Sequence, residues 1–69
     1  MPNQRICRLP EVIARTGLPR STIYELMLND EFPSQIRLGR RTVGWVESEI
    51  EVWIDRRIDV SRRNKIESR

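Results

Sequence analysis

Apolar residues recur with a helical period in three segments of this 69-residue chain. Apolar positions three and four residues apart form a stripe along one side of a helix, so each segment is predicted to be an amphipathic helix. The predicted helices span residues 9–16, 19–29 and 47–58. Their apolar stripes are Leu9, Val12 and Ile13; Ile23, Leu26 and Met27; and Ile50, Trp53, Ile54 and Ile58.

A very short turn separates the first two predicted helices. Gly17 suits the positive φ that often ends a helix, and Pro19 suits a helix start because its missing N–H is no loss there. Ser21 or Thr22 is expected to accept a hydrogen bond from a first-turn N–H group. Two short helices joined in this way are typical of a helix-turn-helix.

Residues 35–46 change to a period of two, which is typical of strands. The runs QIRL and TVGWV are separated by GRR, and a three-residue link containing Gly39 predicts a β-hairpin. Gly44 inside the second run indicates a bulge or a close approach of another backbone. The early run RICR, residues 5–8, is a candidate third strand. Between the second helix and the hairpin, Pro33 forces Phe32 out of helical angles, and Phe32 is expected to enter the core.

The third predicted helix carries its own end signals. Ser48 and Glu51 have the spacing of a capping box, and Arg56 and Arg57 suit the negative C-terminal end of the helix. Residues 59–69 have high charge and little apolar periodicity, so we expect a frayed helical extension or a disordered arm. The prediction is one mostly α-helical domain over residues 1–58, a winged helix-turn-helix with three helices and a wing of two or three strands, followed by a basic tail.

Length and composition exclude several classes of protein. A chain of this size forms one domain with a thin core. It has no histidine, which excludes His-based catalysis and zinc sites, and its one cysteine, Cys7, excludes an intrachain disulfide. We expect Cys7, Trp45 and Trp53 to lie in the core, and we expect no enzyme activity, no metal and no cofactor. The apolar runs are too short for a membrane span, and no secretory signal is recognisable, so a cytoplasmic location is expected.

The charge is segregated along the chain more strongly than the net charge of +3 suggests. Residues 32–46 contain three arginines and no acid, whereas residues 46–55 contain four acids and no base. Residues 56–69 contain six bases and two acids. Basic charge gathered on single elements is what a face that binds nucleic acid requires, although an exposed turn can also carry arginines for solubility.

The second predicted helix has the side chains of a DNA-recognition helix, whose N-terminal residues meet base edges in the major groove. Arg20 can bind guanine through two hydrogen bonds or clamp a phosphate, and Ser21 and Tyr24 offer hydroxyl contacts. Glu25 either accepts from cytosine N4 or turns toward Arg20 or solvent. The hairpin tip would place Arg40 or Arg41 beside or into a minor groove. The candidate DNA-contacting residues are Arg20, Ser21, Thr22, Tyr24, Glu25, Arg37, Arg40 and Arg41.

With these features in place, the chain resembles the AlpA family of small prophage and mobile-element regulators over about residues 6–57. That family is similar in turn to excisionases and to the DNA-binding heads of MerR-type proteins. The resemblance implies a winged helix-turn-helix in which residues 20–24 recognise DNA and Arg37, Arg40 and Arg41 form the wing. Pro19 departs from the serine cap common in the family, and Glu25 stands where a basic residue is common. The matching motifs are TGL at 16–18, RSTIY at 20–24, FP at 32–33, LGRR at 38–41, Trp45 and SEIExW at 48–53.

Three functions are compatible with these features. The first is a sequence-specific, DNA-binding transcriptional regulator of a prophage or integrated element, working at the bacterial nucleoid. The second is an excisionase that bends DNA and recruits an integrase. The third is a module that binds a protein through its acidic third helix. The expected partner is double-stranded DNA, with an integrase or RNA polymerase as candidate protein partners. Because no long coiled coil is present, we expect a monomer in solution that cooperates on DNA.

Overall fold

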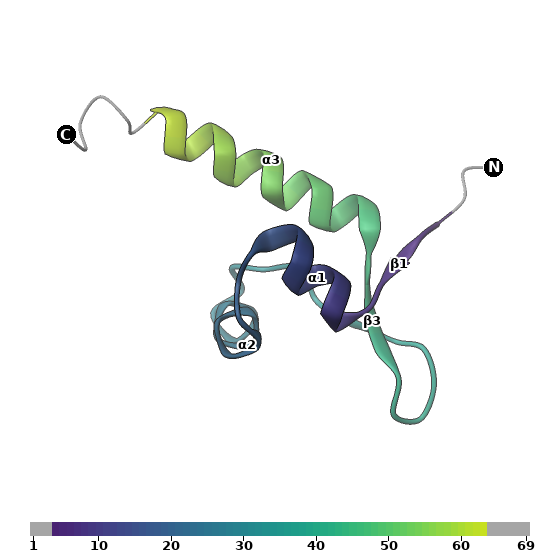
Figure 1. Cartoon of the computed structure of the whole chain (residues 1–69). Coiled ribbons are helices and arrows are strands. Elements are labelled where there is room, and N and C mark those ends of the chain that lie inside the picture. The colour runs from purple at the N-terminus through teal and green to yellow at the C-terminus, as the bar shows by residue number, and fades with distance from the viewer. Residues whose placement is uncertain (1–3, 64–69) are drawn as a thin grey trace.

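The computed structural model describes residues 4–63, which form three helices and a three-stranded antiparallel sheet (Figure 1). This confirms the predicted winged helix-turn-helix architecture, including the candidate third strand. None of the helices in this range is both long and apolar enough to cross a membrane. In chain order the elements are β1 (Ile6–Cys7), α1 (Leu9–Thr16), α2 (Arg20–Leu28), β2 (Ile36–Arg37), β3 (Val43–Val46) and α3 (Glu47–Arg63).

The turn between α1 and α2 takes three residues, as the glycine and proline signals predict. Gly17 has a φ of 74°, and its N–H donates to the carbonyl of Ile13 at 2.8 Å, which ends α1. Leu18 then packs against the core. Pro19 lies just before α2 rather than inside it, so the helix is one residue shorter at each end than the predicted 19–29.

Strand β3 lies at the centre of the sheet, between β1 and β2. The hairpin register pairs Ile36 with Gly44, and the N–H of Leu38 donates to the carbonyl of Thr42 at 2.7 Å. This bond closes the three-residue loop 39–41 that the GRR link predicts. On the other side of β3, Cys7 pairs with Trp45. The wing is therefore fastened to the domain through β1 as well as through its own hairpin.

Gly44 allows β1 to lie against the hairpin. A Cβ atom at this position would lie 2.6 Å from Cγ2 of Ile6 and 3.0 Å from the carbonyl oxygen of Cys7. The first distance is too short for real atoms and the second is tighter than most real contacts, so only glycine fits without a shift of the neighbouring strand. Of the two sequence-based interpretations, a close approach is the correct one.

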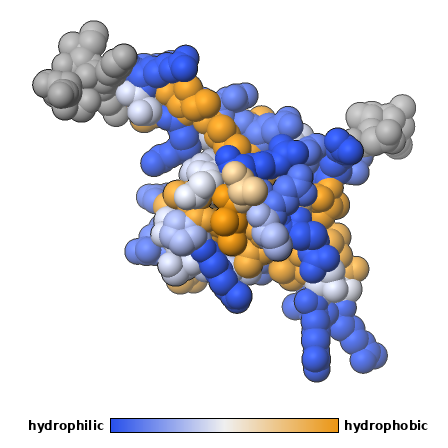
Figure 2. Space-filling model, in the orientation of Figure 1, coloured by the Kyte–Doolittle hydropathy of each residue, from blue (hydrophilic) through white to orange (hydrophobic). Residues whose placement is uncertain are grey.

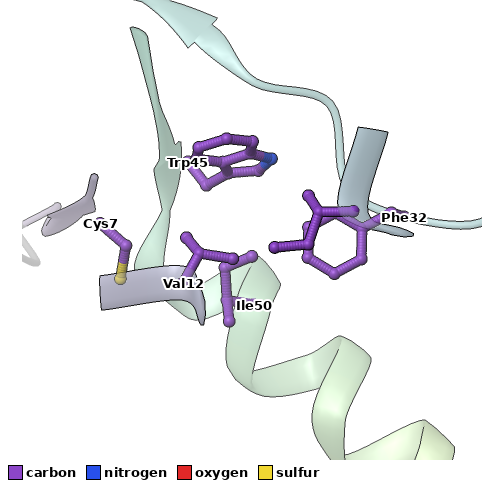
Figure 3. Close-up of a cluster of buried hydrophobic side chains, with 6 residues drawn as sticks. Cys7, Val12, Phe32, Trp45 and Ile50 are labelled. Carbon is purple, nitrogen blue, oxygen red and sulfur yellow. The ribbon is translucent and has the colours of Figure 1, made fainter. Parts of the chain in front are cut away.

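The core lies where α1, β3 and α3 meet (Figure 3). The ring of Trp45 is fully buried, and its indole N–H donates to the carbonyl of Pro33 at 3.1 Å. Trp53 holds the neighbouring loop, because its indole N–H donates to the carbonyl of Glu31 at 2.8 Å and its ring packs edge-on against Phe32. The buried residues are Cys7, Val12, Ile23, Phe32, Trp45 and Ile50, which confirms the expected core roles of Cys7, Phe32 and Trp45.

Helix α3 begins at the predicted residue but lacks the expected capping box, and it runs five residues further than the predicted 47–58. It begins at Glu47, directly after β3, so Ser48 lies inside the helix and the expected capping box is wrong. The first N–H of α3 instead donates to the carbonyl of Arg5 at 2.7 Å. The helix continues to Arg63, which excludes a disordered arm over residues 59–63. Residues 64–69 of the predicted tail lie outside the described residues.

The extra turns of α3 extend past α1 (Figure 1). An ion pair of 3.0 Å between Arg63 and Asp59, one turn apart, supports them, and arginines suit the C-terminal end of a helix. Ile58 was expected in the buried stripe, but its exposed fraction is 43%. The stripe continues along the helix beyond the point where the core ends.

Candidate nucleic-acid interface

The first turn of α2 offers unpaired backbone donors. Neither Ser21 nor Thr22 caps the helix, because the N-cap residue is Pro19 and it makes no side-chain cap bond. The expected side-chain cap is therefore wrong. Ile23 is the first residue whose N–H bonds back to the carbonyl of Pro19. The N–H groups of residues 20–22 therefore lack helical acceptors, and free N–H groups at a helix start can bind a phosphate group.

Arg20 is held at the sheet side of α2 by stacking. Its guanidinium carbon lies 5.3 Å from the centre of the Tyr24 ring, a cation–π contact. Tyr24 in turn packs edge-on against Trp45, with 6.5 Å between the ring centres. Tyr24 is thus half-buried rather than fully on the outer face. The stack Arg20–Tyr24–Trp45 fixes the start of α2 relative to β3.

The other predicted contacts on α2 divide between two sides of the helix. Ser21 and Glu25 are exposed on the outer face, beside Leu28, which is 86% exposed. Within residues 4–63 no ion pair joins Glu25 to Arg20, so the carboxylate faces solvent. The side chain of Thr22 lines a groove together with Leu26, away from Arg20 and Tyr24. The structure therefore groups Arg20, Ser21, Tyr24 and Glu25 and leaves the Thr22 side chain apart.

The hairpin presents its arginines at the far end of the wing. Arg40 and Arg41 are exposed in the loop, and Arg37 donates to the carbonyl of Arg40 at 3.4 Å, which braces the turn. In Figure 1 the hairpin tip and α2 both lie on the side of the molecule away from α3. Figure 2 shows hydrophilic side chains projecting from this side. The predicted recognition helix and wing thus point in the same general direction.

One basic residue near the wing was missed by the sequence analysis. Arg8 is exposed and its Nε donates to the carbonyl of Val43 at 3.0 Å, beside the hairpin loop. The signal was present, because RICR was a candidate strand and Arg8 follows it directly. Pairing of that strand with β3 brings Arg8 to the wing.

Arg15, in contrast, is used inside the fold. Its guanidinium contacts Glu11 at 3.1 Å, Glu47 at 2.6 Å and Glu51 at 3.6 Å. Two of the four acids in residues 46–55 therefore pair with an arginine of α1. This internal pairing weakens the hypothesis of a protein-binding module that uses the acidic start of α3.

The same region contains a cluster that the sequence analysis did not foresee. Ligand atoms of Cys7, Glu11 and Glu47 lie within 4.8 Å of one another. Burial raises the pKa of the Cys7 thiol, and the negative charge of Glu11 raises it further. Because both carboxylates already pair with the Arg15 guanidinium, the cluster is accounted for as part of the α1–α3 contact.

Comparison with known proteins agrees with this geometry. The family model described as prophage CP4-57 regulatory protein (AlpA) matches residues 5–58. An uncharacterized protein, ORF88, of Enterobacteria phage P4 is 47% identical over 60 residues, covering 87% of this chain and 68% of that protein. The DNA-binding transcriptional activator AlpA of Escherichia coli K12 is 42% identical over 59 residues, covering 77% of this chain and 84% of that protein. No solved structure shows a significant match. The chain belongs to the AlpA family of prophage regulatory proteins.

Proposed function

We propose that this protein is a sequence-specific, DNA-binding transcriptional regulator of a prophage or integrated mobile element. One observation supports this most directly. Arg20 at the start of α2 and Arg40 and Arg41 at the hairpin tip are exposed, and none pairs with a carboxylate in the described part of the chain. Unpaired arginines on a helix start and a projecting hairpin suit the negative charge of a DNA backbone.

In the proposed complex, α2 lies in the major groove. The first-turn N–H groups bind a phosphate oxygen, and the Tyr24 ring holds the Arg20 guanidinium in place for the O6 and N7 atoms of a guanine. Ser21 and Glu25 face the same groove, where Glu25 accepts from the N4 amino group of cytosine. A guanidinium that is already positioned loses less side-chain entropy on binding, which favours sequence selectivity.

The wing contacts the adjacent minor groove or the backbone beside it. A narrow minor groove concentrates negative potential, which attracts Arg40 and Arg41. Arg37 braces the loop from behind, and Arg8 adds a further positive charge beside it. These contacts carry little base information, so the wing supplies affinity and orientation while α2 supplies selectivity.

The relatives favour transcriptional regulation over the excisionase alternative. The E. coli relative is named a DNA-binding transcriptional activator, and the family model is named for a regulatory protein. An excisionase would use the same contacts but would also bend DNA and bind repeated sites. Because the proposed ligand is chromosomal DNA, the proposed site of action is the bacterial cytosol.

The test is footprinting and gel-shift titration on the DNA that flanks the protein's own gene, from about 0.05 to about 0.2 M salt. We expect one protected operator, preferred over an unrelated duplex of equal length. If about four phosphates are contacted, the logarithm of affinity should fall with the logarithm of salt concentration with a slope of about −3 to −4. Equal, salt-insensitive binding to both duplexes would refute the proposal. Protection of several repeats with strong bending would favour the excisionase alternative.

A further inference from the structure

A groove lies between α2 and the C-terminal half of α3, and of the predicted DNA contacts only Thr22 lines it. It is open to solvent and has a volume of about 650 Å³. A groove of this size is larger than the short sequence leads one to expect. Figure 2 shows apolar surface along this half of α3. The apolar residues that line the groove are Leu18, Leu26, Trp53, Ile54 and Ile58.

The apolar stripe of α3 continues into the groove without a partner. Ile50, Ile54 and Ile58 follow one another every four residues, so they lie on the same side of the helix. Ile50 is fully buried, Ile54 is partly buried and Ile58 is 43% exposed. No element within residues 4–63 covers Ile58. An exposed apolar helix face that extends beyond the hydrophobic core of its domain is a common feature of surfaces that bind another protein.

The charges around the groove are positive. Arg57 and Arg62 line it, and within the described residues neither forms an ion pair. The guanidinium of Arg57 lies 5.5 Å from the Trp53 ring centre, which holds this charge against the apolar floor. The nearby acid Asp59 is paired with Arg63. The surface complementary to this groove is thus apolar along its centre and carboxylate-bearing at its edges.

We propose that this groove binds an acidic, amphipathic helix of a partner protein. Such a helix would place its apolar side on Ile54 and Ile58 and its carboxylates beside Arg57 and Arg62, a helix-in-groove contact. Duplex DNA is a poorer occupant because the floor is apolar. A second copy of this chain is also a poorer occupant, because Glu47 and Glu51 of its acidic stretch already pair with Arg15. The hairpin tip lies on the side of the molecule away from α3 (Figure 1), which leaves room for the partner and DNA to be bound together.

The probe for this proposal is a pair of synthetic helical peptides of about 14 residues, roughly four turns. Both carry leucines at helical spacing; one has glutamate and the other lysine at the remaining positions. Binding to the full chain is followed by tryptophan fluorescence and by amide chemical shifts. We expect the glutamate peptide to bind at least about tenfold more tightly than the lysine peptide and to shift residues that line the groove.

Variants locate the contact. Ile58→Ser should weaken binding of the glutamate peptide by about tenfold. Val60→Ser, which changes a similarly exposed valine outside the groove lining, should leave this affinity unchanged. The double variant Arg57→Glu, Arg62→Glu should reverse the preference between the peptides. Thermal melts of each variant establish that it is folded.

Three outcomes would overturn the proposal. In the first, the two peptides bind equally well or change the amide chemical shifts of residues outside the groove. In the second, sedimentation shows a dimer with Ile58 in its interface. In the third, duplex DNA alone changes the amide chemical shifts of the groove residues. Ile58→Ser should leave DNA affinity unchanged, so failure of this proposal is distinguishable from failure of the proposed DNA-binding function.

Discussion

The guanidinium of Arg15 lies 2.6 Å from a carboxylate oxygen of Glu47, which joins the end of α1 to the first residue of α3. The side chain of Glu47 is only 15% exposed, so this pair is better shielded from solvent than the other ion pairs of the structure. The contact connects the helix-turn-helix to the segment that carries the wing. Its loss should loosen the packing of these two parts.

Arg15→Met should lower the thermal unfolding midpoint, because it leaves Glu11 and Glu47 close together without a cation. The loss should be larger at low salt than at high salt, since salt screens the remaining repulsion. The matched control is Arg63→Met, which breaks a pair whose partners are 76% and 62% exposed. Exposed ion pairs contribute little to stability, so the control should have nearly the same thermal unfolding midpoint as the original protein. Equal losses in the two variants would contradict this role for Arg15.

Gly44→Ala should destabilise the domain by about 1–3 kcal/mol, because the added methyl group collides with Ile6 and with the backbone of Cys7. Gly39→Ala is the control, since a Cβ there lies no closer than 3.7 Å to its neighbours. Urea titration measures both free energies of unfolding. If the two variants are equally stable, β1 does not lie against Gly44 as the structure indicates.

The Cys7 thiol should make stability depend on pH in the alkaline range. Burial, then the charge of Glu11, raises the pKa of this thiol in the folded state, so the folded protein holds the thiol proton more tightly than the unfolded chain. This contribution is complete below the ordinary thiol pKa and is lost as pH rises through the folded-state pKa. The free energy of unfolding should therefore fall more steeply above about pH 9 than in Cys7→Ala. Parallel curves for the two proteins would exclude the effect.

Arg20→Ala should weaken binding to the preferred operator by about 1–3 kcal/mol and have little effect on unrelated DNA. Arg20→Lys separates the two possible contacts, because lysine keeps the charge but lacks the planar fork that recognises guanine. If residue 20 contacts a phosphate, Arg20→Lys should retain most of the affinity for DNA. If residue 20 contacts a base, Arg20→Lys should lose sequence selectivity. A gel-shift series with single-base changes in the operator measures this directly, and unchanged selectivity in both variants would remove Arg20 from base recognition.

Arg40→Ala should weaken binding to all duplexes alike and reduce the salt slope by about one. Arg56→Ala is the matched control, because it removes the same charge from an exposed position on α3, outside the wing. If Arg56→Ala has the same effect as Arg40→Ala, net charge rather than the wing contact explains the loss.

Local signals in the sequence predicted most of the fold. The spacing of Leu9, Val12 and Ile13 with Gly17 after them predicted α1 with its observed bounds, because periodicity and end signals agree there. The hairpin loop followed from its length and its glycine. The end of α3 was missed, because residues 59–63 contain neither glycine nor proline, and a charged segment can stay helical without an apolar stripe.

The site was predicted less completely, because its details depend on contacts between distant residues. Tyr24 is half-buried through Trp45, 21 positions later, and Arg8 reaches the wing through Val43, 35 positions later. Helical periodicity within α2 carries no information about either neighbour. Likewise the exposed fraction of Ile58 depends on where α1 and α2 end beneath α3, which the stripe itself does not encode.

The absence of a loop between β3 and α3 has a mechanical consequence. Val46 is the last residue of the strand and Glu47 the first of the helix, and the N–H of Glu47 is bonded to Arg5. The chain therefore has no hinge between the hairpin and the long helix. In the proposed DNA complex, a tilt of the wing should therefore be accompanied by a tilt of the start of α3.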